Sequence, residues 1–114
     1  MAAKSPQIDR KATKDKITVT WTGVTESDTF VAYTFDKLAQ DISVHTSGTF
    51  GSATVVYKVA NNGGSGVNAT DLGGTAISHT AEAITSVRER PLTIQPSASG
   101  GSSQSLTVTM VVWL

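Results

Sequence analysis

The feature that most constrains the fold of this chain is the alternation of apolar and polar residues with a period of two. Ile17, Val19 and Trp21 alternate with threonines in the run ITVTWT. Leu106 and Val108 open a second alternating run, SLTVTMVVW, close to the C-terminus. A strand points successive side chains to opposite faces, so each run predicts a strand with one buried face.

Short apolar runs separated by turn residues continue this pattern along the chain. Residues 36–40, DKLAQ, could form one helical turn, so helix should make up less than about one tenth of the chain. The spacing predicts about seven to nine short strands in a sandwich or barrel, and we favour an all-β antiparallel β-sandwich, Ig-like or jelly-roll-like. The further runs are TFVAYTF, DISVHTS, ATVVYKVA, TAISHT, EAITSVRE and PLTIQPS.

Two of these runs are predicted to form a β-hairpin. DISVHTS and ATVVYKVA are separated by GTFGS, a short loop whose glycines adopt positive φ at low cost. TFVAYTF is apolar on both alternations, which predicts a strand covered on both faces. Pro91 and Pro96 cannot donate to a β-ladder, so they should lie at strand ends or edges.

The most strongly patterned strands also predict the core. Each apolar alternation places its large side chains on one face, and opposing faces must bury them together. The residues expected in one core are Trp21, Val55, Tyr57, Val108 and Met110.

Charge divides the chain into two unequal parts. The 114 residues fit a single domain and sum to zero formal charge. Residues 1–16 nevertheless hold five basic and two acidic side chains, a net charge of +3, which leaves −3 on the remainder. We therefore expect an extended basic N-terminal arm over residues 1–16 and a β-sandwich domain over residues 17–114. The arm should be mobile in the free protein and contact neighbouring subunits through Lys4, Arg10, Lys11, Lys14 and Lys16.

Residue types that carry catalysis or bind cofactors are sparse. The absence of cysteine excludes disulfides, thiolate nucleophiles and sulfur-ligated metals. His45 and His79 are too few for a metal site and are expected at a surface or interface. The glycine-rich segments NNGGSG and SGGSS lack the lysine and helix of a phosphate loop. The carboxylates, expected in turns and at strand ends, are mainly Glu26, Asp28, Asp36, Asp41, Asp71, Glu82 and Glu89.

These observations predict a binding or structural protein, with no enzyme activity and no cofactor. The acidic body and core-type aromatics do not support specific nucleic-acid binding. No apolar stretch reaches the roughly 18–20 residues that cross a bilayer, and the start of the chain has no secretion signal, so synthesis in the cytoplasm is expected.

Three segments carry a resemblance to a known group of proteins. In order they are ITVTWTGVTESD, SGTFGSATVVYKVANNGG and RPLTIQPSASGGSSQSLTVTMVVW. Over residues 17–114 the chain resembles small β-sandwich structural proteins of tailed bacteriophages, of the head decoration or cement type.

The resemblance implies a virion protein made in the host cytoplasm and located on the capsid surface. Its implied partners are the major capsid protein, whose outer lattice it would bind to stabilise the head, and neighbouring copies of itself in a homo-oligomer. No catalytic residue carries over from the family. A tail- or fibre-associated module that binds glycans or a host surface remains the alternative.

Overall fold

The computed structural model describes residues 2–13, 15–36, 39–64 and 66–114, without the side chains of residues 2 and 11–13. These residues form strands and no helix, whereas the possible helical turn over residues 36–40 includes residues 37 and 38, which lie outside the described part. The strands are β1 (Ala2–Lys4), β2 (Gln7–Thr13), β3 (Lys16–Val24), β4 (Asp28–Phe30), β5 (Tyr33–Thr34), β6 (Asp41–Thr49), β7 (Thr54–Ala60), β8 (Val67–Asn68), β9 (Ser78–His79), β10 (Ala83–Val87), β11 (Thr93–Ser99) and β12 (Ser105–Trp113).

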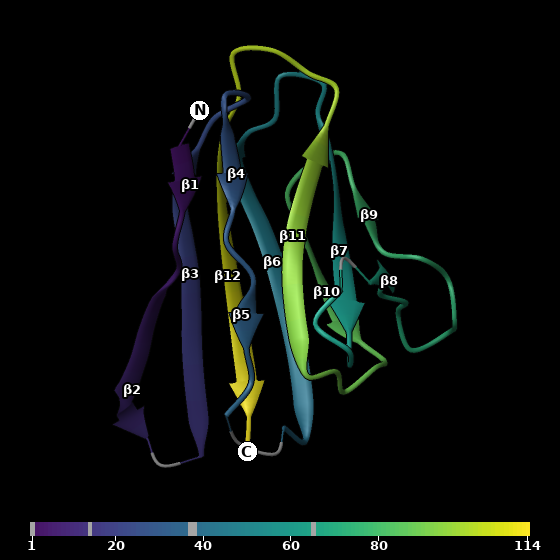
Figure 1. Ribbon diagram of the computed structural model, residues 1–114. Coiled ribbons are helices and arrows are strands. Elements are labelled where there is room, and N and C mark those ends of the chain that lie inside the picture. The colour runs from purple at the N-terminus through teal and green to yellow at the C-terminus, as the bar shows by residue number, and fades with distance from the viewer. Residues whose placement is uncertain (1, 14, 37–38, 65) are drawn as a thin grey trace.

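The strands form two main sheets that pack as a sandwich (Figure 1). The first has the order β10-β6-β12-β3-β2, and the second has the order β5-β11-β7-β8, with β9 also pairing with β7. Within both sheets the pairs are antiparallel, whereas β1 and β4 form a separate parallel pair. The predicted antiparallel β-sandwich is confirmed.

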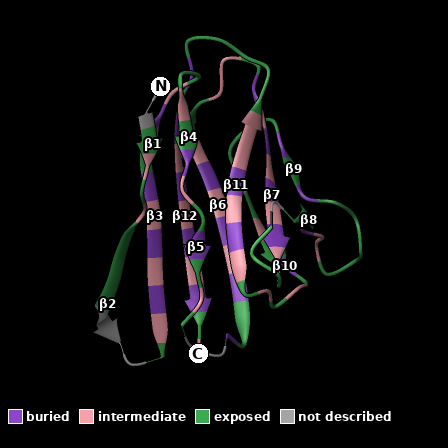
Figure 2. Ribbon diagram, viewed as in Figure 1, coloured by how far each residue is buried: buried purple, intermediate pink, exposed green. Residues whose placement is uncertain are grey.

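The core lies between the two sheets, where the alternating strands turn their apolar faces toward each other (Figure 2). In β3 and β12, buried and partly exposed residues alternate along most of each strand. All five predicted core residues belong to this one cluster and are almost completely buried: Trp21, Val55, Tyr57, Val108 and Met110.

The predicted hairpin between DISVHTS and ATVVYKVA is wrong. β6 and β7 belong to different sheets, so the chain crosses the sandwich between them. Gly48 and Gly51 both have positive φ, and an added Cβ would lie within 2.3 Å of Ser105 O and 1.9 Å of Ser102 O, respectively. The glycines thus permit a close approach to the β11–β12 loop and the start of β12. The same two glycines would also suit a hairpin, which is why local sequence did not separate the two connections.

The run TFVAYTF also differs from its expected position, whereas Pro91 lies just before β11, near a strand end as predicted. TFVAYTF contains two short strands, β4 and β5, and Ala32 and Thr34 are exposed, so it is not covered on both faces. Pro96 lies inside β11, opposite Tyr57. β5 pairs only with Thr93 and Ile94 of β11, so Pro96 needs no ladder partner on that side.

The extended N-terminal arm is not confirmed. β1 pairs with β4, and β2 pairs with β3 at the edge of the first sheet. Residues 7–10 are exposed, and none of the described side chains before Ile17 belongs to the core cluster. Backbone pairing with the edge of β3 can order this segment without core burial. The boundary between residues 16 and 17 remains a prediction.

Candidate functional site

The basic residues predicted to contact other subunits do not form one cluster. Lys4 lies in β1 and Arg10 in β2. Lys11 also lies in β2, but its side chain is outside the described part, as is the whole of Lys14. Lys16 begins β3. Of the described cations, Arg10 and Lys16 therefore lie on the edge strand β2 and its neighbour β3, whereas Lys4 lies on β1.

Two of these cations have partners within the chain. The Arg10 guanidinium forms an ion pair with Asp36, with Nη2 and Oδ2 3.0 Å apart. Because Asp36 follows β5, this pair links the edges of the two sheets. Lys16 Nζ lies 5.9 Å from the ring centroid of Trp113, which is 46% exposed. An exposed tryptophan beside a cation is the type of group that often dominates protein interfaces.

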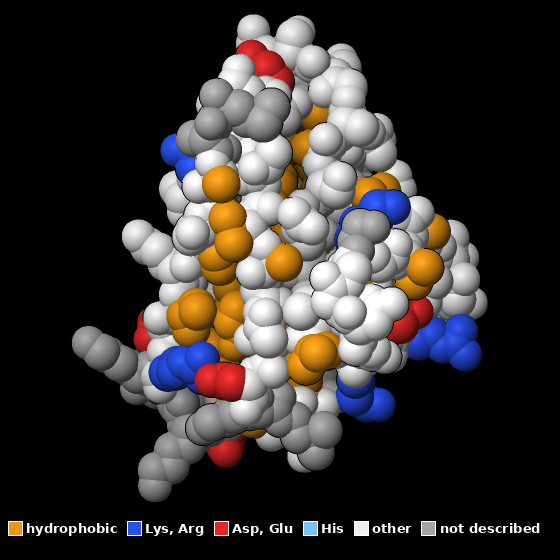
Figure 3. Space-filling model, viewed as in Figure 1, with side chains coloured by type: hydrophobic (Ala, Val, Ile, Leu, Met, Phe, Trp, Pro, Cys, Tyr) orange, Lys and Arg blue, Asp and Glu red, His pale blue; other side chains and the backbone are white. Residues whose placement is uncertain are grey.

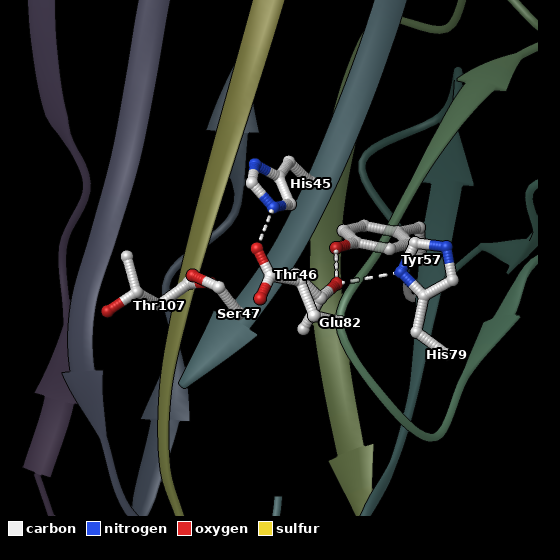
Figure 4. Close-up of polar contacts among 7 residues, drawn as sticks. All are labelled: His45, Thr46, Ser47, Tyr57, His79, Glu82 and Thr107. Carbon is white, nitrogen blue, oxygen red and sulfur yellow. Dashed lines mark hydrogen bonds and ion pairs between the residues drawn. The ribbon is translucent and has the colours of Figure 1, made fainter. Parts of the chain in front are cut away.

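A buried polar cluster links the two sheets (Figure 4). Thr46 of β6, Tyr57 of β7 and His79 of β9 point toward one another. Thr46 Oγ1 lies 2.5 Å from the Tyr57 hydroxyl and 2.8 Å from His79 Nδ1. His79 Nε2 lies 2.8 Å from Thr85 Oγ1. His79 is buried, so its expected place at a surface or interface is wrong.

One assignment of protons satisfies this cluster. Tyr57 O–H donates to Thr46 Oγ1, Thr46 O–H donates to His79 Nδ1, and His79 Nε2–H donates to Thr85. The reverse direction would leave the buried Tyr57 O–H without an acceptor among the described residues. Burial, with His45 nearby, lowers the pKa of His79 and favours the neutral ring that this assignment needs. Burial also raises the pKa of Tyr57 to about 12. The cluster therefore stabilises the contact between sheets and stays uncharged.

The other histidine lies outside this cluster. His45 Nε2 is 2.9 Å from Glu82 Oε2, and both side chains are partly exposed. Since β6 points His45 outward and Thr46 inward, adjacent residues serve opposite faces of the first sheet. This places His45 at the surface, as predicted.

A polar groove of about 430 Å³ lies between β4, β11 and the loop that follows β11. Glu26 at its rim accepts hydrogen bonds from Ser103 N at 3.1 Å and Gln104 N at 3.2 Å. Hydrogen bonds from its own backbone N–H and from Gln104 N–H lower the pKa of Glu26. Gln104 is buried, and its Oε1 has no hydrogen-bond partner among the residues that the structure describes. The groove is rich in acceptors, and sequence patterning did not single it out because its walls come from distant segments.

Within the described residues, no group of three or more His, Cys, Asp or Glu side chains is placed to hold a metal ion. None of the described residues forms a helix suited to crossing a membrane.

Comparison with known proteins gives structural similarity only. No protein-family model matches the chain, and no curated protein matches it. The crystal structure of the SPBc2 prophage-derived protein YomS is similar, with a TM-score of 0.61, 11% identity, and coverage of 86% of this chain and 92% of that one. Protein NMB1881 from Neisseria meningitidis has a TM-score of 0.44 and 8% identity, covering 96% of this chain and 83% of that one. Bacillus endospore appendages, a family of disulfide-linked pili, give a TM-score of 0.42 and 14% identity, covering 96% and 88%.

At 11% identity the similarity to YomS establishes a shared fold, and the other two structures are too distant to add to it. The chain thus has a small β-sandwich fold that is also found in a prophage-derived protein.

Proposed function

We propose that the protein is a virion structural protein of a tailed bacteriophage, and specifically a capsid decoration or cement protein. It binds the outer surface of the major capsid lattice and stabilises the head, without catalysis or a cofactor. The observation that carries the proposal is the fold shared with a prophage-derived protein over most of both chains. The order of the three segments that resemble phage decoration proteins adds support.

The basic edge of the sandwich is the surface proposed to contact the capsid. Trp113 and Lys16 lie together where β3 begins and β12 ends, beside the basic β2 strand. A large aromatic ring supplies contact area at a small entropic cost, and the adjacent cations attract an acidic surface. Because β2 is paired with β3, the backbone that carries these cations is held in place before binding.

Co-sedimentation with phage particles tests this proposal. Particles of the encoding phage that lack the protein are mixed with purified protein and separated into heads and tails. We expect saturable binding to heads that weakens as NaCl rises from about 0.1 to 1 M, which shortens the Debye length from about 10 to about 3 Å. Lys16→Gln and Trp113→Ala should reduce binding. Lys58→Gln, which removes a cation from β7 in the other sheet, is the matched control.

The alternative, a tail- or fibre-associated module that binds glycans or a host surface, is favoured by one observation. The polar groove beside Glu26 offers carboxylate, amide and hydroxyl side chains that suit sugar hydroxyls. Binding to tails and not to heads would support this alternative. Binding to neither fraction would refute both functions.

A further inference from the structure

A rigid turn presents an exposed leucine on the side of the second sheet. Leu72 is 71% exposed, more than any other large hydrophobic residue described. Asp71 holds the turn closed: its Oδ1 accepts hydrogen bonds from Gly73 N at 2.9 Å and Thr75 N at 3.0 Å. Its backbone pairs with Thr75 O at 2.8 Å and Gly74 N at 2.9 Å. We call residues 71–75 the Leu72 turn. Four hydrogen bonds fix its shape, so binding through Leu72 costs little conformational entropy.

A groove of about 510 Å³ lies close to this turn, because Glu89 in its wall is hydrogen-bonded to Thr70, the residue that precedes Asp71. Its walls are mainly hydrocarbon, and Val67, which is 69% exposed, is one of them. Pro91 contributes a second apolar wall, whereas Glu89 and Arg90 bring both signs of charge. We call it the β8 groove. Figure 3 shows hydrophobic side chains among charged ones on this side of the molecule, over β7, β8 and the loop that follows.

Hydrogen bonds fix the turn relative to the groove. Glu89, which lines the β8 groove, accepts hydrogen bonds from Thr70 N at 2.9 Å and Thr70 Oγ1 at 2.5 Å. Arg88 N donates to Thr70 O at 2.9 Å. Although burial acts to raise it, the pKa of Glu89 is lowered by the hydrogen bonds from Thr70, so the carboxylate form is maintained. The Leu72 turn and the β8 groove therefore behave as one rigid surface.

We propose that this surface joins two copies of the chain about a twofold axis, with Leu72 of each copy in the β8 groove of the other. A protrusion and a hollow side by side make a self-complementary surface, because a twofold axis forms each contact twice. Charge agrees with this arrangement. The Glu89 carboxylate already accepts two hydrogen bonds from Thr70, and, among the described residues, Arg90 uses only its Nε, which donates to Gln40 O at 2.8 Å. The Arg90 guanidinium is therefore the charged group of the groove that Asp71, beside Leu72, would face in the second copy. The inference rests on the part of the proposed function that names neighbouring copies as partners, and it identifies the surface that they use.

Analytical ultracentrifugation of the purified protein, without phage particles, tests the contact. We expect a reversible dimer in the wild type. Leu72→Ser should raise the dissociation constant of the dimer on the order of 100-fold, because each dimer loses two buried leucines. Ile84→Ser should leave it unchanged, since Ile84 is 66% exposed but lies on β10 of the other sheet. A wild type that stays monomeric at every concentration, or a Leu72→Ser dimer of unchanged strength, overturns the proposal.

Disulfide trapping tests the arrangement, because the chain has no cysteine of its own. Purified Leu72→Cys and Val67→Cys variants are mixed under mild oxidation, and a cross-link between the two variants is expected. Ile84→Cys replaces Val67→Cys in the control and should give none. A stable dimer without the Leu72→Cys to Val67→Cys cross-link overturns this arrangement. If Leu72→Ser is monomeric yet still binds heads, the capsid contact stands apart from this one.

Discussion

Replacing Thr46 with valine tests how much the buried polar cluster contributes to holding the two sheets together. Valine keeps the shape of threonine but replaces its hydroxyl with a methyl group. Thr46 is completely buried, so water cannot take the place of the lost group. The change leaves both the Tyr57 hydroxyl and His79 Nδ1 without the partner that they now share.

The expected cost follows from the number of groups left unpaired. A buried polar group without a hydrogen bond costs about 1–3 kcal/mol, so two of them should lower the free energy of unfolding by roughly 2–6 kcal/mol. Tyr57→Phe removes one hydroxyl and leaves the contact between Thr46 and His79, so its expected cost is about 1 kcal/mol. In the double variant only His79 is unpaired. Its cost should therefore be smaller than the sum of the single costs by about 1 kcal/mol or more.

Urea denaturation, followed by circular dichroism and by the fluorescence of buried Trp21, measures these free energies. The wild type and the three variants form a double-mutant cycle. If Thr46→Val costs less than about 0.5 kcal/mol, or if the two single costs add, the cluster is not coupled as the distances indicate.

Three further outcomes are expected. Burial lowers the pKa of His79 in the folded state, so the unfolded chain binds more protons as the pH falls below about 6.5. The free energy of unfolding measured in urea titrations should therefore fall between about pH 7 and 5. It should fall less in His79→Gln. Gly51→Ala should lower the melting temperature far more than Gly63→Ala, because its Cβ would lie 1.9 Å from Ser102 O whereas Gly63 has open space; equal losses would mean that positive φ alone matters. Val108→Ala should cost roughly 2–4 kcal/mol in urea unfolding, and an unchanged midpoint would contradict its place in the core.

Local periodicity was enough to identify the most strongly patterned strands, such as β3 and β12, and their buried faces. In ITVTWT and SLTVTMVVW, each side chain's face follows from its position along a pleated backbone, whichever strand lies next to it. The core residues could be predicted for the same reason. The direction of a side chain is a property of neighbouring residues, and it is present in the sequence.

The candidate site was predicted less well. Residue type alone identified the cations of the N-terminal segment, but not their pairing with Asp36 and Trp113. The cluster around His79 could not be predicted, because a histidine between serine and threonine gives the same sequence pattern whether it faces the core or the solvent. The Leu72 turn carried a signal that was overlooked, since Asp-Leu-Gly-Gly-Thr places an aspartate where it can close a turn.

The sequence by itself determined an all-β chain, its strand faces and most of its core, because these follow from contacts between near neighbours along the chain. Only the tertiary structure decided that β6 and β7 lie in different sheets, and that residues 2–13 form strands beside β3 and β4. Which strands pair depends on how residues far apart in the chain compete for the same edge and the same core. A period of two fits every such pairing equally well, so tertiary packing must choose among them.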